Sequence, residues 1–587
     1  MRTRSLASAL FPYAIFLLLS LVSWNRWIEP YVDSGRELMT PLRIARGEQL
    51  YRDVRFYHGP LGPYAAAAVE VLFPRSLPAR VLFAAAIALL HLEGIRRLAM
   101  RFLSAARAAL ATALIVAVAF FLRPGGCHLF PFSLDTSIAV AAITWALYFR
   151  GGGARRDGWL ASGCLFAALL SRPELGLAAA AALLAGRGRP GGETPWQRRI
   201  VTLALLPLGA AALVYAALSR GVSRDTLLSE GWLAFLSPPA AFRNIYASYA
   251  GLDRPGLRLA ELLLAAIVLA VVGAVLFGGS YLAGRARAGA LVEAVTLLLL
   301  AAAALVRYRP PAGYAETLSL FPPLIRVVPV LVLAALLARV LRRLARREDR
   351  GFLADVPDPV LLIAALLSLR MLLVAGYFGP YNAFLLPLPL LVAIAGVFAA
   401  ADRLAPAAGQ SFPRLVAGAL AILLLFRAGS LHDIFRHRAW SWVPTSAGAL
   451  FVTEPVAETT RLTLADLSGR LPPDGTLVGF PEAGFLNYAL GARNPLPQEQ
   501  FFPGHLDPEA EEETIQRLSA RPPDAIAYIN VLAVGHRSAI FGKDYLPELD
   551  RFVRERFSPV AAYGPGAASP AAPRIGDPGF FIEVRAP

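Results

Sequence analysis

The sequence is short of the residues that a soluble domain or a disulfide framework requires. Only 17% of its 587 residues are charged, against about 25% in soluble domains, and Lys543 is the only lysine. The two cysteines, Cys127 and Cys164, are too few for a disulfide framework or a metal cluster, so we expect both to be small packing residues. A convincing P-loop, zinc motif or Ser-His-Asp signature is also missing. Enzymes built on those motifs are therefore disfavoured.

Long apolar runs are what the sequence has in abundance. Hydrophobic residues make up 56% of the chain, and the mean hydropathy is +0.54. Many runs approach the ~20 residues that a helix needs to cross a bilayer, so we expect a polytopic α-helical membrane protein. Thirteen transmembrane helices are predicted, near 8–24, 79–98, 106–122, 133–149, 158–171, 174–186, 200–218, 258–282, 288–306, 324–341, 358–376, 383–401 and 412–428.

Arginine accounts for the formal net charge of +16, and its placement predicts how the chain crosses the membrane. Arginines stand in alternate short loops, among them Arg96–Arg97, Arg155–Arg156 and Arg342–Arg343. Short cytoplasmic loops carry such an excess of positive charge, so we place these loops and the N-terminus, with an uncleaved first span, in the cytoplasm. We expect a multi-pass protein of the bacterial cytoplasmic (inner) membrane. Nucleic acid is disfavoured as a partner because topology explains the charge.

The chain changes character near residue 430, where charge rises and apolar runs shorten. Two short runs, 476–480 and 525–529, read as buried strands, and 580–584 reads as a last strand. Residues 510–520 read as a solvated helix. We therefore divide the chain into a transmembrane part, 1–429, and a small α/β domain, 430–587, on the outer side of the membrane.

A dense polar loop, residues 25–78, directly follows the first span. A carboxylate just outside a membrane span, such as Asp33, can act as a general base. Gly35 lets the backbone approach a ligand closely, and Arg36 either pairs with the acids of the loop or binds an anion. Glu37 stands four residues after Asp33, so on a helix the two share a face. Glu37 is then a second acid or a partner of Arg36, and the alternative is a surface loop whose charges pair with each other.

Three motifs of this loop resemble the first outer loop of GT-C glycosyltransferases. The nearest branch contains the protein O-mannosyltransferases and the lipid A aminoarabinose transferases. The resemblance is strongest in the N-terminal part of the chain and implies a GT-C-like fold. The motifs are Asp33-Ser-Gly-Arg-Glu37, Gly47-Glu-Gln-Leu-Tyr-Arg-Asp53 and Tyr57-His-Gly-Pro-Leu61.

The resemblance implies an enzyme that takes a sugar from a polyprenyl-phosphate carrier and passes it, with inversion, to an acceptor on the outer face. The acceptor is a glycan, a lipid or a protein, and membrane lipids surround the site. Asp33 matches the essential acidic residue of that branch. The mannosyltransferase pattern has two adjacent acids, whereas Ser34 follows Asp33 here, so the resemblance does not imply which sugar is moved.

Two further places in the sequence put charge beside the proposed donor site. Ser171-Arg172-Pro173-Glu174 interrupts an apolar stretch, and ionisable groups at membrane depth usually face a cavity or a partner. The family often has a basic residue, Pro and Glu here, which implies that Arg172 meets the donor phosphate and Glu174 orients it. The alternative is an ion pair that only bends the helices. His58, after Tyr57, binds the acceptor or a metal, or is structural.

The remaining candidates lie near the outer ends of spans. We expect Arg370, inside the span 358–376, to reach the lipid phosphate and Arg307 to belong to a lid over the donor. The alternative is that both arginines snorkel to the membrane surface. Asp135 is a second acidic site residue or, as we prefer, the N-cap of a helix over 136–149.

The expected function is therefore a membrane glycosyltransferase that uses a polyprenyl-phosphate-linked sugar, with Asp33 as base. A divalent metal ion at the acidic loop is left open as a cofactor. The alternatives are a transporter or flippase of lipid-linked sugars, and a non-catalytic membrane component of envelope polysaccharide assembly. An inverted-repeat transporter gains no support, because no internal repeat stands out. We expect the tail segment 480–488 to dock the acceptor or to cover the active site.

Overall fold

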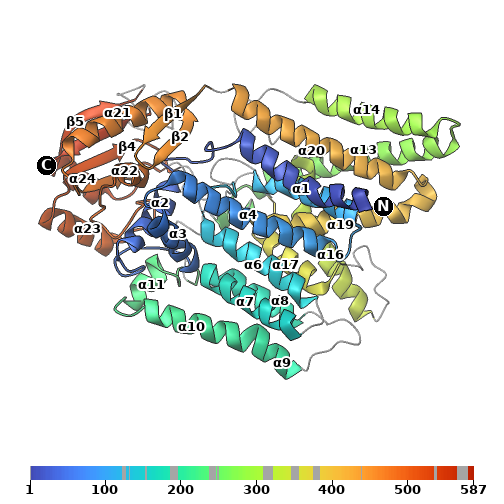
Figure 1. Cartoon of the computed structure of the whole chain (residues 1–587), viewed down its shortest axis with the longest axis horizontal. Helices are drawn as coiled ribbons and strands as arrows, with labels where there is room; N and C mark the ends of the chain where they lie inside the picture. The colour runs from blue at the N-terminus through green and yellow to red at the C-terminus, as the bar shows by residue number, and fades with distance from the viewer. Residues whose placement is uncertain are drawn as a thin grey trace.

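The protein consists of a bundle of helices and a mixed α/β tail at one end of the bundle (Figure 1). The computed structural model describes residues 2–121, 127–130, 133–151, 155–185, 196–236, 246–247, 250–307, 322–345, 356–373, 384–437, 439–533, 539–564 and 580–587. We call the residues between helices α1 (Arg2–Val22) and α4 (Leu77–Ala99) the first loop, and the residues after helix α20 (Phe412–His437) the tail.

The first half of the chain is helical and contains two short helices inside the first loop. Apolar runs with few Gly or Pro residues in their interiors form the longer helices. The first-loop helices are α2 (Ser34–Ala45) and α3 (Leu61–Leu72). The others are α1 (Arg2–Val22), α4 (Leu77–Ala99), α5 (Ala105–Ile115) with the π-helical turn η1 (Val116–Phe120), α6 (Leu134–Arg150), α7 (Arg155–Ser171), α8 (Pro173–Ala185), α9 (Trp196–Ile200) with η2 (Val201–Leu205), α10 (Leu206–Leu218) and α11 (Arg224–Glu230).

The second half of the bundle continues this pattern and ends in a long helix that leads to the tail. Twelve of the thirteen predicted spans overlap over most of their length with one helix or with helical segments that follow each other directly, whereas α17 (Asp358–Leu369) covers only the first part of the span 358–376. The helices of the second half are α13 (Pro255–Arg285), α14 (Gly289–Arg307), α16 (Pro322–Leu344), α17 (Asp358–Leu369), α19 (Pro387–Ala408) and α20 (Phe412–His437).

The bundle confirms a multi-span membrane protein. Shorter apolar helices accompany the long ones; α17, with 12 residues, is about 18 Å long and does not by itself cross the ~30 Å hydrocarbon core. The number of thirteen crossings therefore stays a prediction. Within the described ranges, five helical stretches are long and apolar enough to cross a bilayer: Leu77–Ala99, Gln197–Leu218, Pro255–Arg285, Pro387–Ala408 and Phe412–His432.

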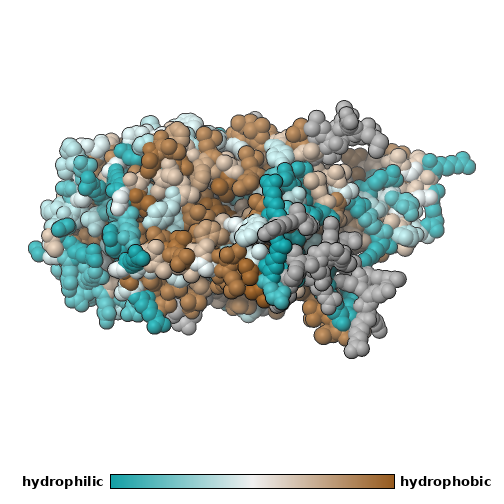
Figure 2. Space-filling model, turned by 60° about the horizontal axis from the view of Figure 1, so that its bottom comes forward, coloured by the Kyte–Doolittle hydropathy of each residue, from teal (hydrophilic) through white to brown (hydrophobic). Residues whose placement is uncertain are grey.

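The outside of the bundle is apolar. On α13, Leu263, Leu264 and Val271 are each more than half exposed, which would be unfavourable in water but suits contact with lipid. Figure 2 shows hydrophobic side chains gathered in a band across the middle of the visible face, with the hydrophilic tail on one side of it. Both cysteines are free, Cys127 being buried and Cys164 lying in α7, as expected for packing residues.

Two helix ends near the predicted donor site decide where its arginines lie. The predicted break at Ser171–Glu174 is confirmed, because α7 ends at Ser171 and α8 begins at Pro173. We expected Arg370 to lie inside a span. Instead, α17 ends at Leu369 and Arg370 is its C-cap. The helix stops there, so the Arg370 side chain leaves from the end of the helix and not from its wall.

The tail is built on a four-stranded mixed sheet in the order β3-β4-β6-β5. Here β3 and β4 are parallel, and β6 pairs antiparallel with both β4 and β5. Aromatic and aliphatic side chains, including Phe480, Phe501 and Leu549, form a buried core on this sheet. The elements are β1 (Trp440–Thr445), β2 (Gly448–Thr453), α21 (Glu454–Arg470), β3 (Leu477–Phe480), α22 (Gly484–Leu490), α23 (Pro508–Ala520), β4 (Ala525–Ile529), α24 (Pro547–Arg556), β5 (Ser558–Tyr563) and β6 (Ile582–Ala586).

The predicted strands at 476–480 and 525–529 and the predicted helix at 510–520 are confirmed as β3, β4 and α23. The last predicted strand is displaced by two residues, to β6. The antiparallel β1–β2 hairpin and β5 were not predicted. In β1 and β5, buried and exposed residues do not alternate strictly along the strand. Strict alternation is the signal by which a half-buried strand is recognised.

The tail docks on the first loop through two glycines. A Cβ atom on Gly35 of α2 would lie 2.8 Å from the backbone nitrogen of Phe485 and 3.0 Å from Cα of Gly484, at the start of α22. Conversely, a Cβ on Gly484 would lie 3.0 Å from the carbonyl carbon of Gly35. The two helix ends approach so closely because neither residue carries a side chain.

Replacing Gly35 by Ala should therefore separate the tail from the first loop. The added methyl group meets backbone, which cannot rotate away, so we expect Gly35→Ala to lower the free energy of unfolding by about 1–3 kcal/mol. Thermal unfolding of the detergent-solubilised protein measures the loss. Gly469→Ala is the control, because its Cβ has no neighbour within 4 Å. Equal unfolding temperatures for the two variants would contradict the close contact.

Candidate functional site

The side chain of Arg36 connects the first loop to the tail. It belongs to the first turn of α2 and is buried. Its Nη1 donates to Oε1 of Gln500 in the tail at 2.9 Å, and its Nη2 donates to Oε1 of Glu37 at 3.2 Å. Nη1 also lies 3.6 Å from Oδ1 of Asp33. A buried guanidinium must be paired and hydrogen-bonded, and here the partners come from both parts of the chain.

Arg36 also determines which way the amide of Gln500 faces. Because the amide oxygen accepts from Arg36, the amide nitrogen faces the opposite side, where two carboxylates lie. Nε2 donates to Oδ1 of Asp33 at 2.9 Å and to Oε2 of Glu482 at 3.0 Å. The backbone N–H of Asp33 donates to the same Glu482 oxygen at 2.9 Å. We call Asp33, Arg36, Glu482 and Gln500 the Asp33 network.

The two carboxylates of this network differ in their access to a ligand. The Asp33 side chain is 24% exposed, whereas Glu482 is 1% exposed. Burial raises the pKa of Glu482, and the negative charge of Asp33 raises it further. Asp33 is therefore the acid that a substrate can reach. Glu482 and Gln500 were not predicted as site residues, and the only sequence signal for Glu482 was a carboxylate inside an otherwise apolar segment.

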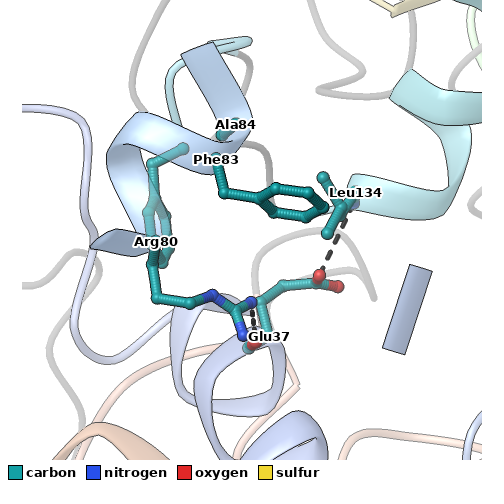
Figure 3. Close-up of a pocket in the computed structure, with 6 residues that line it drawn as sticks. Glu37, Arg80, Phe83, Ala84 and Leu134 are labelled. Atoms are coloured by element: carbon teal, nitrogen blue, oxygen red, sulfur yellow. Dashed lines mark hydrogen bonds between the residues drawn. The ribbon is translucent and has the colours of Figure 1, made fainter. Parts of the chain in front are cut away.

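The spacing had suggested that Glu37 and Asp33 share a helix face, but in the structure they do not. Asp33 precedes the helix with φ 56°, so its side chain does not follow the helical repeat. Glu37 instead points toward α6, where its Oε2 accepts from the backbone of Leu134 at 3.5 Å (Figure 3). Arg80 donates to the backbone carbonyl of Glu37 at 2.9 Å. The gap beside Glu37 measures about 10 Å³ and holds at most one water.

Burial raises the pKa of Glu37, although the charge of Arg36 opposes that rise. The Glu37 side chain contacts the Asp33 network through this guanidinium, and the Glu37 backbone N–H donates to the carbonyl of Asp33 at 3.2 Å. Its position favours the role of a partner of Arg36, one of the two roles left open by the sequence.

A cavity of about 340 Å³ lies beside the Asp33 network. It brings together five of the predicted site residues, which come from the first loop, the α7–α8 break and the end of α17. Aromatic side chains form much of the remaining wall, and two guanidinium groups face the space. The lining residues are Tyr57, His58, Arg172, Pro173, Glu174, Trp232, Ala234, Phe235, Tyr246 and Arg370.

Glu174 lies between the two arginines of the cavity. Its Oε1 accepts from Nε of Arg172 at 2.8 Å and lies 4.0 Å from Nη1 of Arg370. The Arg370 guanidinium is also 4.9 Å from the ring centre of Tyr246. Arg172 Nη1 donates to a ring nitrogen of His58 at 3.0 Å. Burial lowers the pKa of His58 well below its usual range, and the charge of Arg172 lowers it further. His58 is therefore neutral and accepts this hydrogen bond.

Asp135 is not the N-cap that we preferred. Helix α6 begins at Leu134 with Ser133 as its N-cap residue, so Asp135 belongs to the first turn. Its Oδ1 accepts from the Ser133 hydroxyl at 3.4 Å, and its Oδ2 lies 3.6 Å from Nη1 of Arg172. The structure thus places Asp135 behind Arg172, as a buried countercharge and not at the mouth of the cavity. The helix thus starts two residues before the position 136 that a cap at Asp135 would give.

Two series of contacts connect the cavity with the Asp33 network. The ring of Tyr57 lies 4.8 Å from that of His505, whose Nδ1 is 3.2 Å from the backbone carbonyl of Gln500. On the other side, Phe56 contacts both the Arg36 guanidinium, at 6.0 Å, and the ring of His58, at 5.6 Å. The two parts therefore form one continuous candidate site. Arg307 ends α14, and its side chain, with the rest of the predicted lid, lies outside the described residues.

The sequence left open a divalent metal ion at the acidic first loop. The described residues contain no group of three or more His, Cys, Asp or Glu side chains placed to share a metal ion. The acids found here are bound to arginine or amide groups instead, as Asp33 is to Gln500 and Glu174 to Arg172. The donor set does not fit a resident divalent ion, and we derive no chemistry through one.

Over nearly its whole length the chain is structurally similar to two glycosyltransferases. One is ArnT from Cupriavidus metallidurans bound to undecaprenyl phosphate, at 15% identity and TM-score 0.45, covering 98% of this chain and 97% of that chain. The other is the archaeal oligosaccharyltransferase AglB from Archaeoglobus fulgidus, in complex with an inhibitory peptide and a dolichol-phosphate. It is 12% identical at TM-score 0.45, covering 89% of this chain and 69% of that chain.

No protein-family model and no curated protein matches the chain. At these identities no residue role passes from either neighbour to this chain, so the roles of the site residues rest on the geometry above.

Arg43 should be essential for the docking of the tail on the first loop. It is buried, and its guanidinium donates to Glu499 at 2.7 Å and to the carbonyl of Leu496 at 2.8 Å, both in the tail. Arg43→Ala leaves the buried Glu499 charge without its partner, so we expect a loss of about 3–5 kcal/mol in the free energy of unfolding.

The matched control is Arg52→Ala, which removes an exposed pair with Asp53 and should cost less than about 1 kcal/mol. Thermal unfolding of both purified variants measures the difference. An Arg43→Ala protein as stable as Arg52→Ala would show that the first loop and the tail are not held together in this way.

Proposed function

We propose that the protein is an inverting membrane glycosyltransferase of the GT-C type, which moves a sugar from a polyprenyl-phosphate carrier to an acceptor hydroxyl group. The observation that carries the proposal is a partly exposed, firmly held carboxylate, Asp33, in a network that contacts through Tyr57 and Phe56 connect to a cavity with two arginines. The first-loop motifs support the same reading, because Asp33 matches the essential acid of the resembled branch. The proposed orientation, from the arginines of the alternate loops, puts this site on the outer face.

The cavity suits the phosphate end of a lipid-linked sugar. Its volume of about 340 Å³ is within the ~300–1,000 Å³ typical of ligand pockets. Arg172 and Arg370 would bind the phosphate oxygens, since guanidinium groups match phosphate geometry. Glu174 keeps both arginines directed into the cavity, and Trp232 and Tyr246 provide apolar walls for the sugar and the first prenyl unit. The charged groups in the wall of the cavity are the two arginines and Glu174, and an anionic ligand would bind to the two guanidinium groups.

The reaction would proceed by one displacement at the anomeric carbon. The acceptor oxygen bonds to that carbon while its proton passes to Asp33, and the bond from the carbon to the phosphate oxygen breaks. The electron pair of that bond leaves with the phosphate, which is already a weak base and needs no general acid. Arg172 and Arg370 stabilise the charge that grows on the leaving phosphate. One base and no covalent intermediate give inversion, in contrast to the paired carboxylates of retaining glycosidases.

The first test replaces Asp33 by Asn, which keeps the size of the side chain but cannot take up the proton. We expect sugar transfer to fall by about 10²–10⁴-fold. The measurement is transfer of label from a radiolabelled polyprenyl-phosphate sugar pool in membranes containing the protein. Asp53→Asn, in the same loop, is the control and should transfer at a rate close to that of the wild type.

Normal transfer by Asp33→Asn would show that Asp33 is not the base. A wild-type protein that transfers no sugar to any of a broad set of acceptors, yet lets labelled lipid-linked sugar cross the membrane, would favour the transporter alternative. A protein with neither activity would favour a non-catalytic role in envelope assembly.

The second test addresses the phosphate site through Arg370, which is only loosely paired, at 4.0 Å from Glu174. Arg370→Gln removes one charged hydrogen-bond donor, worth about 1.5–3 kcal/mol, so the KM for the lipid-linked donor should rise about 10- to 100-fold. Arg224→Gln, on the exposed face of α11, is the control with little effect. Equal donor KM values in both variants would place the phosphate elsewhere.

A further inference from the structure

We propose that the tail supplies two positioning residues, Glu482 and Gln500, that hold Asp33 in its reactive place, so that transfer requires the tail to be docked on the first loop. The inference rests on the proposed function, because it assigns these residues a part in the same reaction. It differs from the expected roles of the tail, which were acceptor docking and covering of the site.

Asp33 depends on the tail for both its backbone and its side chain. Its φ of 56° lies in the left-handed region, which a residue other than glycine seldom adopts without a compensating contact. The backbone N–H of Asp33 finds that contact in Oε2 of Glu482, at 2.9 Å. The carboxylate is bound by the Gln500 amide at 2.9 Å. Both anchors belong to residues more than 440 positions away in the sequence.

Glu482 and Gln500 also fix each other. The Gln500 amide donates to Oε2 of Glu482 at 3.0 Å, and its oxygen accepts from Arg36 at 2.9 Å. The same Glu482 oxygen therefore accepts from the backbone of Asp33 and from the amide that holds the Asp33 carboxylate. Removing the Glu482 carboxyl group frees both anchors at once. Glu482 is 1% exposed, so it acts through Asp33 and does not itself meet a substrate.

The charges around Glu482 decide its protonation state. Asp33, the N-cap residue of α2, and Arg36, in the first turn of α2, are the charged groups that act on Glu482. Gln500 is neutral, and Nδ1 of His505 lies within hydrogen-bond distance of the Gln500 carbonyl. Arg36 is the cation among these groups, and it also pairs with Asp33 and Glu37. Burial raises the pKa of Glu482, and so does the charge of Asp33. Glu482 is thus neutral, and the carbonyl oxygen of its carboxyl group accepts from both N–H groups.

Ionisation of Glu482 places a second negative charge beside Asp33, and Arg36 is already shared between Asp33 and Glu37. The wild-type enzyme should therefore lose activity as the pH rises through the raised pKa of Glu482. A glutamine at this position is always neutral, and its amide oxygen can accept the same two hydrogen bonds. The glutamine variant should keep the geometry and lack the alkaline loss.

The experiment measures kcat and donor KM for transfer as a function of pH in the full-length wild type, Glu482→Ala and Glu482→Gln, with Glu509→Gln on the exposed face of α23 as control. We expect Glu482→Ala to lower kcat by about 10- to 100-fold, as for a misplaced catalytic group, with a donor KM close to that of the wild type. Glu482→Gln should restore most of kcat and remove the alkaline limb of the pH profile.

Two results would overturn the inference. If Glu482→Gln is as inactive as Glu482→Ala, the ionised carboxylate is required and Glu482 is not a neutral positioning residue. If Glu482→Ala keeps its kcat, the tail does not hold Asp33. A fold disrupted by the alanine change would appear as a raised KM and a lowered unfolding temperature, and the glutamine variant then decides by its pH profile.

A second measurement separates this inference from the proposed function. A carboxyl group whose pKa is raised in the folded state costs stability as the pH rises above its unfolded value of about 4.3. The unfolding temperature of the wild type should therefore fall, relative to Glu482→Gln, as the pH rises above about 5. If the wild type transfers no sugar, the proposed function fails, but this difference still supports the network. Parallel curves for the two proteins would overturn it.

Discussion

The arrangement of the site depends on one buried charge, the guanidinium of Arg36. Because a buried cation is costly without partners, its hydrogen bonds to Gln500 and Glu37, at 2.9 and 3.2 Å, require the tail and the first loop to be assembled around it. The hydrogen bond from Arg36 to Gln500 fixes the amide of Gln500, which in turn binds Asp33 and Glu482. The tail thus supplies hydrogen bonds to both the backbone and the side chain of Asp33. The close approach of Gly35 and Gly484 is what brings Gln500 within reach.

The second half of the site is made by interruptions in the helices. Irregular backbone inside a membrane protein is stable only where it lines a cavity or is buried in protein. The break between α7 and α8 presents Arg172 and Glu174, and the end of α17 presents Arg370. All three line one cavity. Asp135 and His58 lie behind or beside Arg172 and restrain its direction. The Asp33 network and the cavity with its two arginines are joined through Tyr57, His505 and Phe56.

The sequence allowed the helical bundle, the α7–α8 break and the importance of the first loop to be predicted, because each has a local signal in apolar length or in charge within an apolar run. Arg172, Glu174 and Arg370 were named from charge within apolar runs, and Tyr57 and His58 from the motifs of the first loop. The structure brings all five to one cavity. Glu482 and Gln500 could not be named, because their partners lie more than 440 residues away and no spacing rule connects them. The preferred cap role of Asp135 was wrong because two neighbouring residues, Ser133 and Asp135, could each begin the helix.

The proposed reaction requires a lipid-linked sugar to bind with its phosphate between Arg172 and Arg370 and its anomeric carbon toward Asp33. The most direct measurement is an experimental structure of the wild-type protein with a non-reactive polyprenyl-phosphate sugar analogue. The account predicts phosphate oxygens within hydrogen-bond distance of both guanidinium groups. It also predicts that the Asp33 carboxylate, still bound by Gln500, lies on the face of the sugar opposite the phosphate. A phosphate bound outside this cavity, or an Asp33 that faces away from the sugar, would contradict it.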